Sequence, residues 1–300
     1  MDSAETRQGR SGGARGMPLV ARVALHTVLA VLSVFYLLPL VWAVSTSLKT
    51  EAQVSFQPET NPRELAAYFI PRPVVWSNYT EALTQENVPF HFFFANSILI
   101  TTYCLIGGLF SASLVAYGFA MHRFPGRDAL FYAMLGTMMV PGVVTMIPSF
   151  ILFRELGWIN TPLPLIVPSF FGGGAFAIFL FRQFFLTLPR ELIDAGKIDG
   201  CSPFGVYWHI VMPLSKPVLA TLAIFTFLGV WNDFMGPLVY LHDMKRRTVA
   251  LGLYSFQGVY YTNWPYLMAA SIVALVPVLA VFLACQRYFV RGIQLSGIKG

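Results

Sequence analysis

Asp233 is the residue of this sequence whose chemistry is hardest to reconcile with its surroundings. It follows Trp231 and Asn232 within a long run of apolar residues, where a carboxylate is costly unless it serves a function or reaches water. An acid in the interior of a helix bundle could carry a proton or contact a polar solute, whereas an acid beside water would only be solvated. The sequence alone leaves both interpretations open.

Other residue types that often do chemistry show no useful spacing. The five histidines lack the separations typical of metal ligands. The pair Gly196-Lys197 lacks both the preceding glycine and the following Ser or Thr of a phosphate-binding loop. Cys104, Cys201 and Cys285 are odd in number and far apart, which favours packing over a disulfide framework. We therefore expect no catalytic, cofactor-binding or metal site in this chain.

The composition indicates a membrane protein. Of the 300 residues, 56% are hydrophobic and only 11% are charged, whereas ordinary soluble domains carry about 25% charged residues. The mean hydropathy is +0.63. So few charges could not cover a water-facing surface, which argues against a soluble enzyme, a disordered protein and a secreted disulfide scaffold. The net charge of +6 is then better explained by basic loops on one side of a membrane than by nucleic-acid binding.

Long stretches without charged residues predict about six membrane-spanning helices, because one span needs roughly 20 mostly apolar residues. The predicted apolar segments are Val23 to Leu48, Phe92 to Ala120, Ala129 to Phe153, Leu156 to Phe181, Val218 to Leu241 and Tyr266 to Gln286. The first is too long for a cleavable signal peptide and no small-residue cleavage site follows it. The fold class predicted is thus an all-α polytopic membrane protein.

The basic residues predict the orientation of these spans. With a cytoplasmic N-terminus, thirteen of the 20 Lys and Arg residues fall in inside segments and seven in outside segments, which places both termini in the cytoplasm. The outer cluster Lys245-Arg246-Arg247 runs against this bias and has no explanation in the sequence. The longest outer loop, Lys49 to His91, could dock an extracytoplasmic partner or simply be solvated.

The third and fourth predicted spans contain five prolines and the run Gly172-Gly173-Gly174. Proline removes a backbone donor and kinks a helix, and such breaks persist in a membrane only where protein or water satisfies the freed groups. The broken helices could line a pathway that opens and closes, or they could reflect ordinary bundle packing.

The segment from Leu188 to Pro217 predicts two short helices joined by a sharp bend. Pro189 suits a first helical turn, with acidic residues following it. Asp199-Gly200 is typical of a helix stop and turn, and Ser202-Pro203 of a cap followed by a first-turn proline. The second helix carries an apolar stripe. An ordered, amphipathic element between two spans predicts either a docking element for a cytoplasmic partner or contact with lipid.

This segment resembles the EAA loop of ABC importer permeases, the coupling helix that docks onto the ATP-binding subunit. Asp194-Ala195-Gly196 occupies the Glu-Ala-Ala position, Gly200 matches the family glycine, and Ile210 to Pro213 matches the closing Ile-x-Leu-Pro. Asp for Glu keeps the charge on a shorter arm, whereas Gly for the second Ala should weaken the helix by about 1 kcal/mol. The resemblance implies the following coupling residues: Glu191, Asp194, Ala195, Gly196 and Gly200, with Phe204 and Tyr207 as packing anchors.

Further motifs resemble the carbohydrate-importer branch of the family: Asn96-Ser97, Phe124 to Gly126, Trp231 to Asp233, and the ending from Arg287 to Gly300. The ending is most similar to that of the maltose-type permease subunit, whose tail reaches the interface of the ATP-binding dimer. That similarity implies a tail contact through Gly297, Lys299 and Gly300. The candidate residues of the solute pathway are Asn96, Trp231, Asn232 and Asp233.

The resemblance implies a multi-pass permease of the bacterial inner membrane that forms half of a pathway for a sugar or oligosaccharide. The partners implied are a second permease subunit, two ATP-binding subunits that hold ATP and Mg, an extracytoplasmic solute-binding protein and the lipid bilayer, but no nucleic acid. The domains expected are a disordered cytoplasmic tail (1–16), the permease domain (17–290, with the coupling loop at 186–217) and a cytoplasmic C-terminal tail (291–300). The alternatives are the same role for glycerol phosphate or another small solute, an ion-coupled secondary transporter that uses Asp233, and an integral membrane enzyme.

Overall fold

A computed structural model describes residues 18–55, 69–85, 88–257 and 262–296 of the chain, with side chains described up to 286. Its elements, within those ranges, are helical apart from one isolated bridge between Gln257 and Thr262. The helices are α1 (Leu19–Ser47), α2 (Glu51–Ser55), α4 (Ser77–Thr84), α5 (Phe90–Met121), α6 (Arg127–Gly136), η2 (Thr137–Met139), α7 (Gly142–Glu155), α8 (Leu163–Ile166), η3 (Val167–Phe170), α9 (Ala175–Phe185), α10 (Arg190–Ile198), α11 (Pro203–Val206), η4 (Tyr207–Val211), α12 (Met212–Leu214), α13 (Lys216–Trp231), α14 (Met235–Tyr240), η5 (Met244–Arg246), α15 (Val249–Tyr254) and α16 (Trp264–Ser296). The predicted all-α fold is confirmed.

Four of the helical stretches are long and apolar enough to cross a membrane, and the count rises to six if each of two bent helix pairs is one span. This agrees with the prediction of about six. The first and second predicted spans match α1 and α5 within a few residues at each end. The last matches the apolar part of α16, Trp264–Gln286, whereas the helix itself continues to Ser296. These are the spans whose apolar run contains neither three consecutive glycines nor closely spaced prolines.

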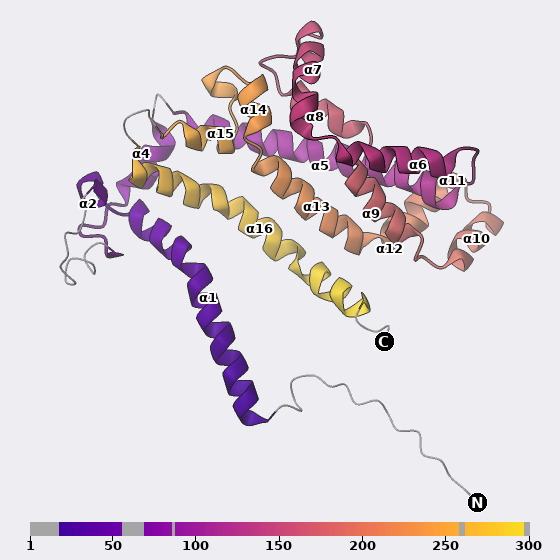
Figure 1. Ribbon diagram of the computed structural model, residues 1–300, viewed down its shortest axis with the longest axis horizontal. Coiled ribbons are helices and arrows are strands. Elements are labelled where there is room, and N and C mark those ends of the chain that lie inside the picture. Colours follow the sequence, from indigo (N-terminus) through magenta and orange to yellow (C-terminus); the bar gives the residue numbers. More distant parts are fainter. Residues whose placement is uncertain (1–17, 56–68, 86–87, 258–261, 297–300) are drawn as a thin grey trace, which may run out of the picture.

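The third predicted span is sharply bent. Its two halves, Arg127–Met139 and Gly142–Glu155, meet at an angle of 97°. The bend lies at Val140 and Pro141, both of which have extended backbone conformations. Because the residue before a proline is pushed out of the helical region, the helix stops at this point. In Figure 1, α7 accordingly projects away from the rest of the bundle.

The fourth predicted span starts later than expected, at Leu163, and is interrupted at the glycine run, where Gly173 adopts a φ of 60°. A side chain at Gly173 would place its Cβ 2.2 Å from the carbonyl oxygen of Gly108 on α5. Ser111 of α5 accepts a hydrogen bond from the Gly172 amide at 3.1 Å and donates one to the Ser169 carbonyl at 3.0 Å. The break is therefore seated on α5, which supplies partners for its freed backbone groups.

The prediction that the fifth span runs on to Leu241 is wrong. Helix α13 ends at Trp231, and α14 begins only at Met235. Asp233 lies in the gap, where its carboxylate accepts a hydrogen bond from the Gly236 amide at 3.1 Å. Acidic side chains favour this capping geometry over a place inside a helix, so the carboxylate satisfies a backbone amide at the start of α14.

Helix α5 runs through the centre of the bundle and contacts α9, α13 and α15 (Figure 1). Two main clusters of buried side chains pack along it. One surrounds Tyr117, Phe181 and Tyr207, and the other surrounds Phe90, Trp231 and Ala270. Helix α1 meets α16 near α4 and then diverges from the bundle. No residue of the apolar window of α1 is buried.

Candidate functional site

The segment 186–217 folds as the local sequence predicts. Helix α10 ends at Ile198, and Gly200 reverses the chain with a φ of 82°, a conformation that favours glycine. The Ser202 side chain then accepts a hydrogen bond from the Gly205 amide at 3.1 Å and caps α11, with Pro203 at its first position. Pro189 is the cap of α10 rather than a first-turn residue. The two predicted short helices and the bend between them are confirmed.

Gly196 lets these two short helices pack together. It is buried in α10, and a Cβ at this position would lie 2.5 Å from the Cδ1 atom of Ile210 and 3.6 Å from the Cγ2 atom of Val206. An alanine would require the end of the Ile210 side chain to shift. The glycine that departs from the Glu-Ala-Ala pattern therefore lets the two helices approach closely in this chain, although glycine has a weaker helix propensity.

Tyr207 fixes the segment to the long central helix. Its side chain is fully buried, and its hydroxyl lies 2.8 Å from the Ser113 hydroxyl of α5. The ring also packs 5.3 Å from that of Tyr117, whose own hydroxyl donates to the Pro203 carbonyl at 3.0 Å. These contacts lie in the irregular stretch η4, which is one turn of π-helix. A displacement of the segment would thus be transmitted directly to α5.

The outer face of the segment carries both charge and apolar surface. Glu191, Asp194, Ala195 and Gly200 are exposed, as a docking role requires. Phe204 is 56% exposed, so of the two predicted packing anchors only Tyr207 packs within this chain.

Two apolar residues on the same segment escaped the sequence reasoning. Ile198 is 86% exposed at the end of α10, and Trp208 is 51% exposed and stacks on Phe204 at a ring distance of 6.3 Å. The apolar stripe of the second helix pointed to Trp208, but nothing in the spacing showed which side of that stripe faces outward. Together they give the face an apolar surface as well as a charged one.

Asp194 is held in place by Lys197, whose ammonium donates to the carboxylate at 2.8 Å. Both side chains are mostly exposed, so the pair adds little to stability. Its effect is to orient the carboxylate on the outer face of α10. The negative charge also lies on the same face as Glu191 one turn earlier.

The four candidate pathway residues lie near the opposite end of the bundle but have different surroundings. Trp231 is buried, stacks on Phe227 at a ring distance of 5.4 Å and donates to the Ala274 carbonyl at 3.2 Å. It joins α13 to α16. Asn232 is exposed, and its amide donates to the Leu228 carbonyl of its own helix at 2.9 Å. Asp233 caps α14 and has no ion-pair partner among the described residues.

Asn96 holds in place the loop that carries the basic cluster Lys245-Arg246-Arg247, which ran against the predicted orientation. Its amide donates to the carbonyls of Lys245 and Arg247, at 2.8 and 3.0 Å. The neighbouring Ser97 accepts from the Val249 amide at 2.8 Å. The Asn96-Ser97 pair therefore ties the 245–249 stretch to the start of α5.

The three basic side chains of this stretch also have protein partners. Lys245 lies over the ring of Phe92, with its ammonium 5.7 Å from the ring centroid. Arg246 lies 3.6 Å from the Asp243 carboxylate and donates to the Asn160 carbonyl. Arg247 donates to the Ser255 hydroxyl at 3.0 Å. The cluster is thus part of a folded loop rather than a free patch of charge.

Some predicted features lie outside the described residues, namely the tail 1–16 and the tail residues Gly297, Lys299 and Gly300. Among the residues that the structure does describe, no group of three His, Cys, Asp or Glu side chains has metal-binding geometry.

Several known proteins are similar to this chain in sequence. The chain is 34% identical over 284 residues to the arabinooligosaccharides transport system permease protein AraQ of Bacillus subtilis, covering 94% of this chain and 97% of that protein. It is 33% identical over 274 residues to the sn-glycerol-3-phosphate transport system permease protein UgpE of Yersinia enterocolitica, covering 89% and 94%.

A solved structure is also similar. It is the crystal structure of a bacterial ABC transporter that imports the acidic polysaccharide alginate, with a TM-score of 0.75, 22% identity and coverage of 90% of this chain and 96% of that one. Residues 105–295 match the family described as the binding-protein-dependent transport system inner membrane component. The matched range contains the whole 186–217 segment, the broken fourth span and most of α5. The chain therefore belongs to the binding-protein-dependent transport system inner membrane component family.

Proposed function

We propose that this chain is the permease subunit of an ATP-binding-cassette importer and forms half of the translocation pathway for a sugar or oligosaccharide. The observation that carries this proposal is the 186–217 segment, hereafter the coupling segment. It offers an exposed acidic and apolar face, while buried Tyr207 fixes it to α5. Family membership and the oligosaccharide relative support the same role.

The proposed partners are a second permease subunit, two ATP-binding subunits that hold ATP and Mg, and an extracytoplasmic solute-binding protein. In this arrangement the chain itself is non-catalytic and spans the bacterial inner membrane several times. Both termini and the coupling segment face the cytoplasm, which is the side that the excess of basic residues favours.

Closure of the ATP-binding dimer would move the outer face of the coupling segment. Because Gly196 packs on Ile210 and Tyr207 contacts Ser113, the segment moves with α5 rather than sliding along it. The glycine and proline breaks in the third and fourth spans are places where such a movement can be absorbed. The bundle then acts as a two-state element that is biased by ATP on one side and by the loaded binding protein on the other.

A comparison of two charge reversals tests the coupling role. Asp194 on α10 and Glu155 on α7 are both mostly exposed acids paired with a neighbouring cation, at 2.8 and 2.9 Å. We expect Asp194→Lys to lower ATPase stimulation by the binding protein and substrate at least tenfold in the reconstituted transporter. Glu155→Lys, a matched change outside the coupling segment, should leave ATP-binding subunits attached and stimulated. Equal stimulation of the two variants would contradict the coupling role.

Glycerol phosphate is the second candidate solute, because one similar permease carries that name. A phosphorylated solute calls for a free cation along its path. The basic side chains at positions 245, 246 and 247 each contact a protein group, which favours an uncharged sugar. Calorimetry of the cognate binding protein with oligosaccharides and with sn-glycerol 3-phosphate separates the two solutes.

A further inference from the structure

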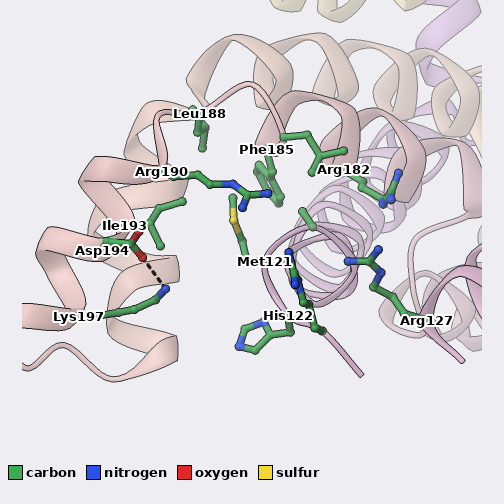
Figure 2. A pocket seen from close by; sticks show the side chains of 13 residues that line it. Met121, His122, Arg127, Arg182, Phe185, Leu188, Arg190, Ile193, Asp194 and Lys197 are labelled. Atoms are coloured by element: carbon green, nitrogen blue, oxygen red, sulfur yellow. Dashed lines mark hydrogen bonds and ion pairs between the residues drawn. The ribbon is translucent and has the colours of Figure 1, made fainter. Parts of the chain in front are cut away.

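A strongly basic pocket lies beside the coupling segment, where α5 and α9 end and α10 begins (Figure 2). Its volume is about 360 Å³. Five cationic side chains and one carboxylate are among the residues that line it. The cations are Arg123, Arg127, Arg182, Arg190 and Lys197, and the carboxylate is Asp194. Figure 2 shows Arg190 reaching from α10 towards Phe185, with Arg182 and Arg127 on the far side.

The acids of the protein leave much of this charge unbalanced. Lys197 is paired with Asp194 at 2.8 Å, and Arg127 with Asp128 at 2.9 Å. Arg123, Arg182 and Arg190 have no ion pair with any described residue. Arg182 is held over the ring of Phe131, 4.2 Å from its centroid, and its Nε atom is buried without a hydrogen-bond partner. Like charges gathered in this way favour an anion between them.

An apolar groove of about 700 Å³ lies along α5, α6 and α9, the helices whose ends help to line the pocket. Leu130 of α6 lies one turn after Arg127, and Ile178 of α9 lies one turn before Arg182. Residues three or four apart share one helix face. The groove and the pocket are therefore neighbouring parts of one surface, apolar along the helices and basic at their ends.

We propose that this surface binds one anionic phospholipid, with the headgroup phosphate in the basic pocket and an acyl chain in the groove. A soluble anion would account for the cations but not for the groove, and a zwitterionic lipid would account for the groove but not for the unpaired arginines. Basic pockets between membrane helices are suited to acidic headgroups, and this pocket lies where two apolar helices, α5 and α9, end. The inference requires only that these helices lie in a bilayer, so its test does not depend on which solute the protein transports.

Native mass spectrometry of the intact transporter tests the proposal. The delipidated complex is incubated with phosphatidylglycerol, with phosphatidylcholine, or with phosphatidylglycerol and millimolar inorganic phosphate. We expect phosphatidylglycerol to be retained over phosphatidylcholine and not to be displaced by phosphate. The double change Arg182→Gln and Arg190→Gln should lower retention about 30-fold, which corresponds to roughly fivefold for each charge removed near the headgroups.

Two further variants separate the headgroup from the chain. Leu130→Trp fills the groove without changing any charge and should also lower phosphatidylglycerol retention. Arg154→Gln, at an exposed arginine of α7, should not. Undiminished retention in both the double variant and Leu130→Trp would overturn the proposal. So would displacement of the lipid by phosphate, which would indicate a site for free anions, or equal retention of phosphatidylcholine.

Discussion

Gly196 shows how a single residue departs from a family pattern for a steric reason. The Cδ1 atom of Ile210 lies 2.5 Å from the position that a Cβ atom would occupy. Glycine therefore allows close packing here, although it has a lower helix propensity than alanine. We expect Gly196→Val to destabilise the protein by about 1–3 kcal/mol, as overpacking of a tight contact does. Ala195→Val, on the exposed neighbouring position, is the matched control and should cost under about 0.7 kcal/mol of helix propensity. Thermal unfolding of the purified transporter measures both, and equal losses would contradict the packing explanation.

The sequence could place the candidate residues along the chain but not on a face of the fold. Phe204 and Tyr207 are three residues apart on one short helix, yet Tyr207 is fully buried and Phe204 is mostly exposed. Trp231 is equally ambiguous, because an aromatic ring beside an amide suits a sugar as well as a helix interface. Only the packing of α16 against α13 shows that its indole donates to a backbone carbonyl. Side-chain direction depends on which helices meet, and distant parts of the chain decide that.

At the scale of elements, the loop between α14 and α15 is a folded unit held by α5. Asn96 donates to two of its carbonyls, and each such hydrogen bond contributes about 1 kcal/mol. We expect Asn96→Ala to open the loop and to speed trypsin cleavage after Lys245, Arg246 and Arg247 about 30-fold in the purified transporter. Asn232→Ala removes an asparagine that donates only to its own helix and should leave the cleavage rate unchanged. An unaltered rate in Asn96→Ala would mean that other contacts hold the loop.

The helices were predictable from the sequence where one uninterrupted apolar run forms one helix. Helices α1, α5 and α16 are uninterrupted apolar runs, and the bends in the third and fourth spans lie at the prolines and glycines that predicted them. The end of α13 was not predictable in this way, because the apolar run resumes directly after Asn232 and Asp233. One capping carboxylate, Asp233, divides that run. Hydropathy averages over a window and is insensitive to a single hydrogen bond.

At the scale of the molecule, the proposed orientation can be read from a native cysteine. Cys201 is exposed between α10 and α11, whereas Cys104 is buried. If the coupling segment faces the cytoplasm, a membrane-impermeant maleimide should label Cys201 in inside-out vesicles and not in intact cells. Cys201→Ser should abolish the signal and so exclude a contribution from Cys285. Labelling of Cys201 in intact cells would reverse the orientation of every span.

The exposure of α1 has a consequence for biogenesis. None of its residues belongs to a described core cluster. It contacts α16, and its C-terminal end is fixed by the Asn78 amide of α4, which donates to the carbonyls of Ser47 and Lys49 at 2.8 Å each. Its insertion during synthesis therefore depends on its own hydropathy rather than on packing. The first span can insert into the bilayer before the later helices have been synthesised. Its position is then fixed once α4 has been synthesised and packs against its C-terminal end.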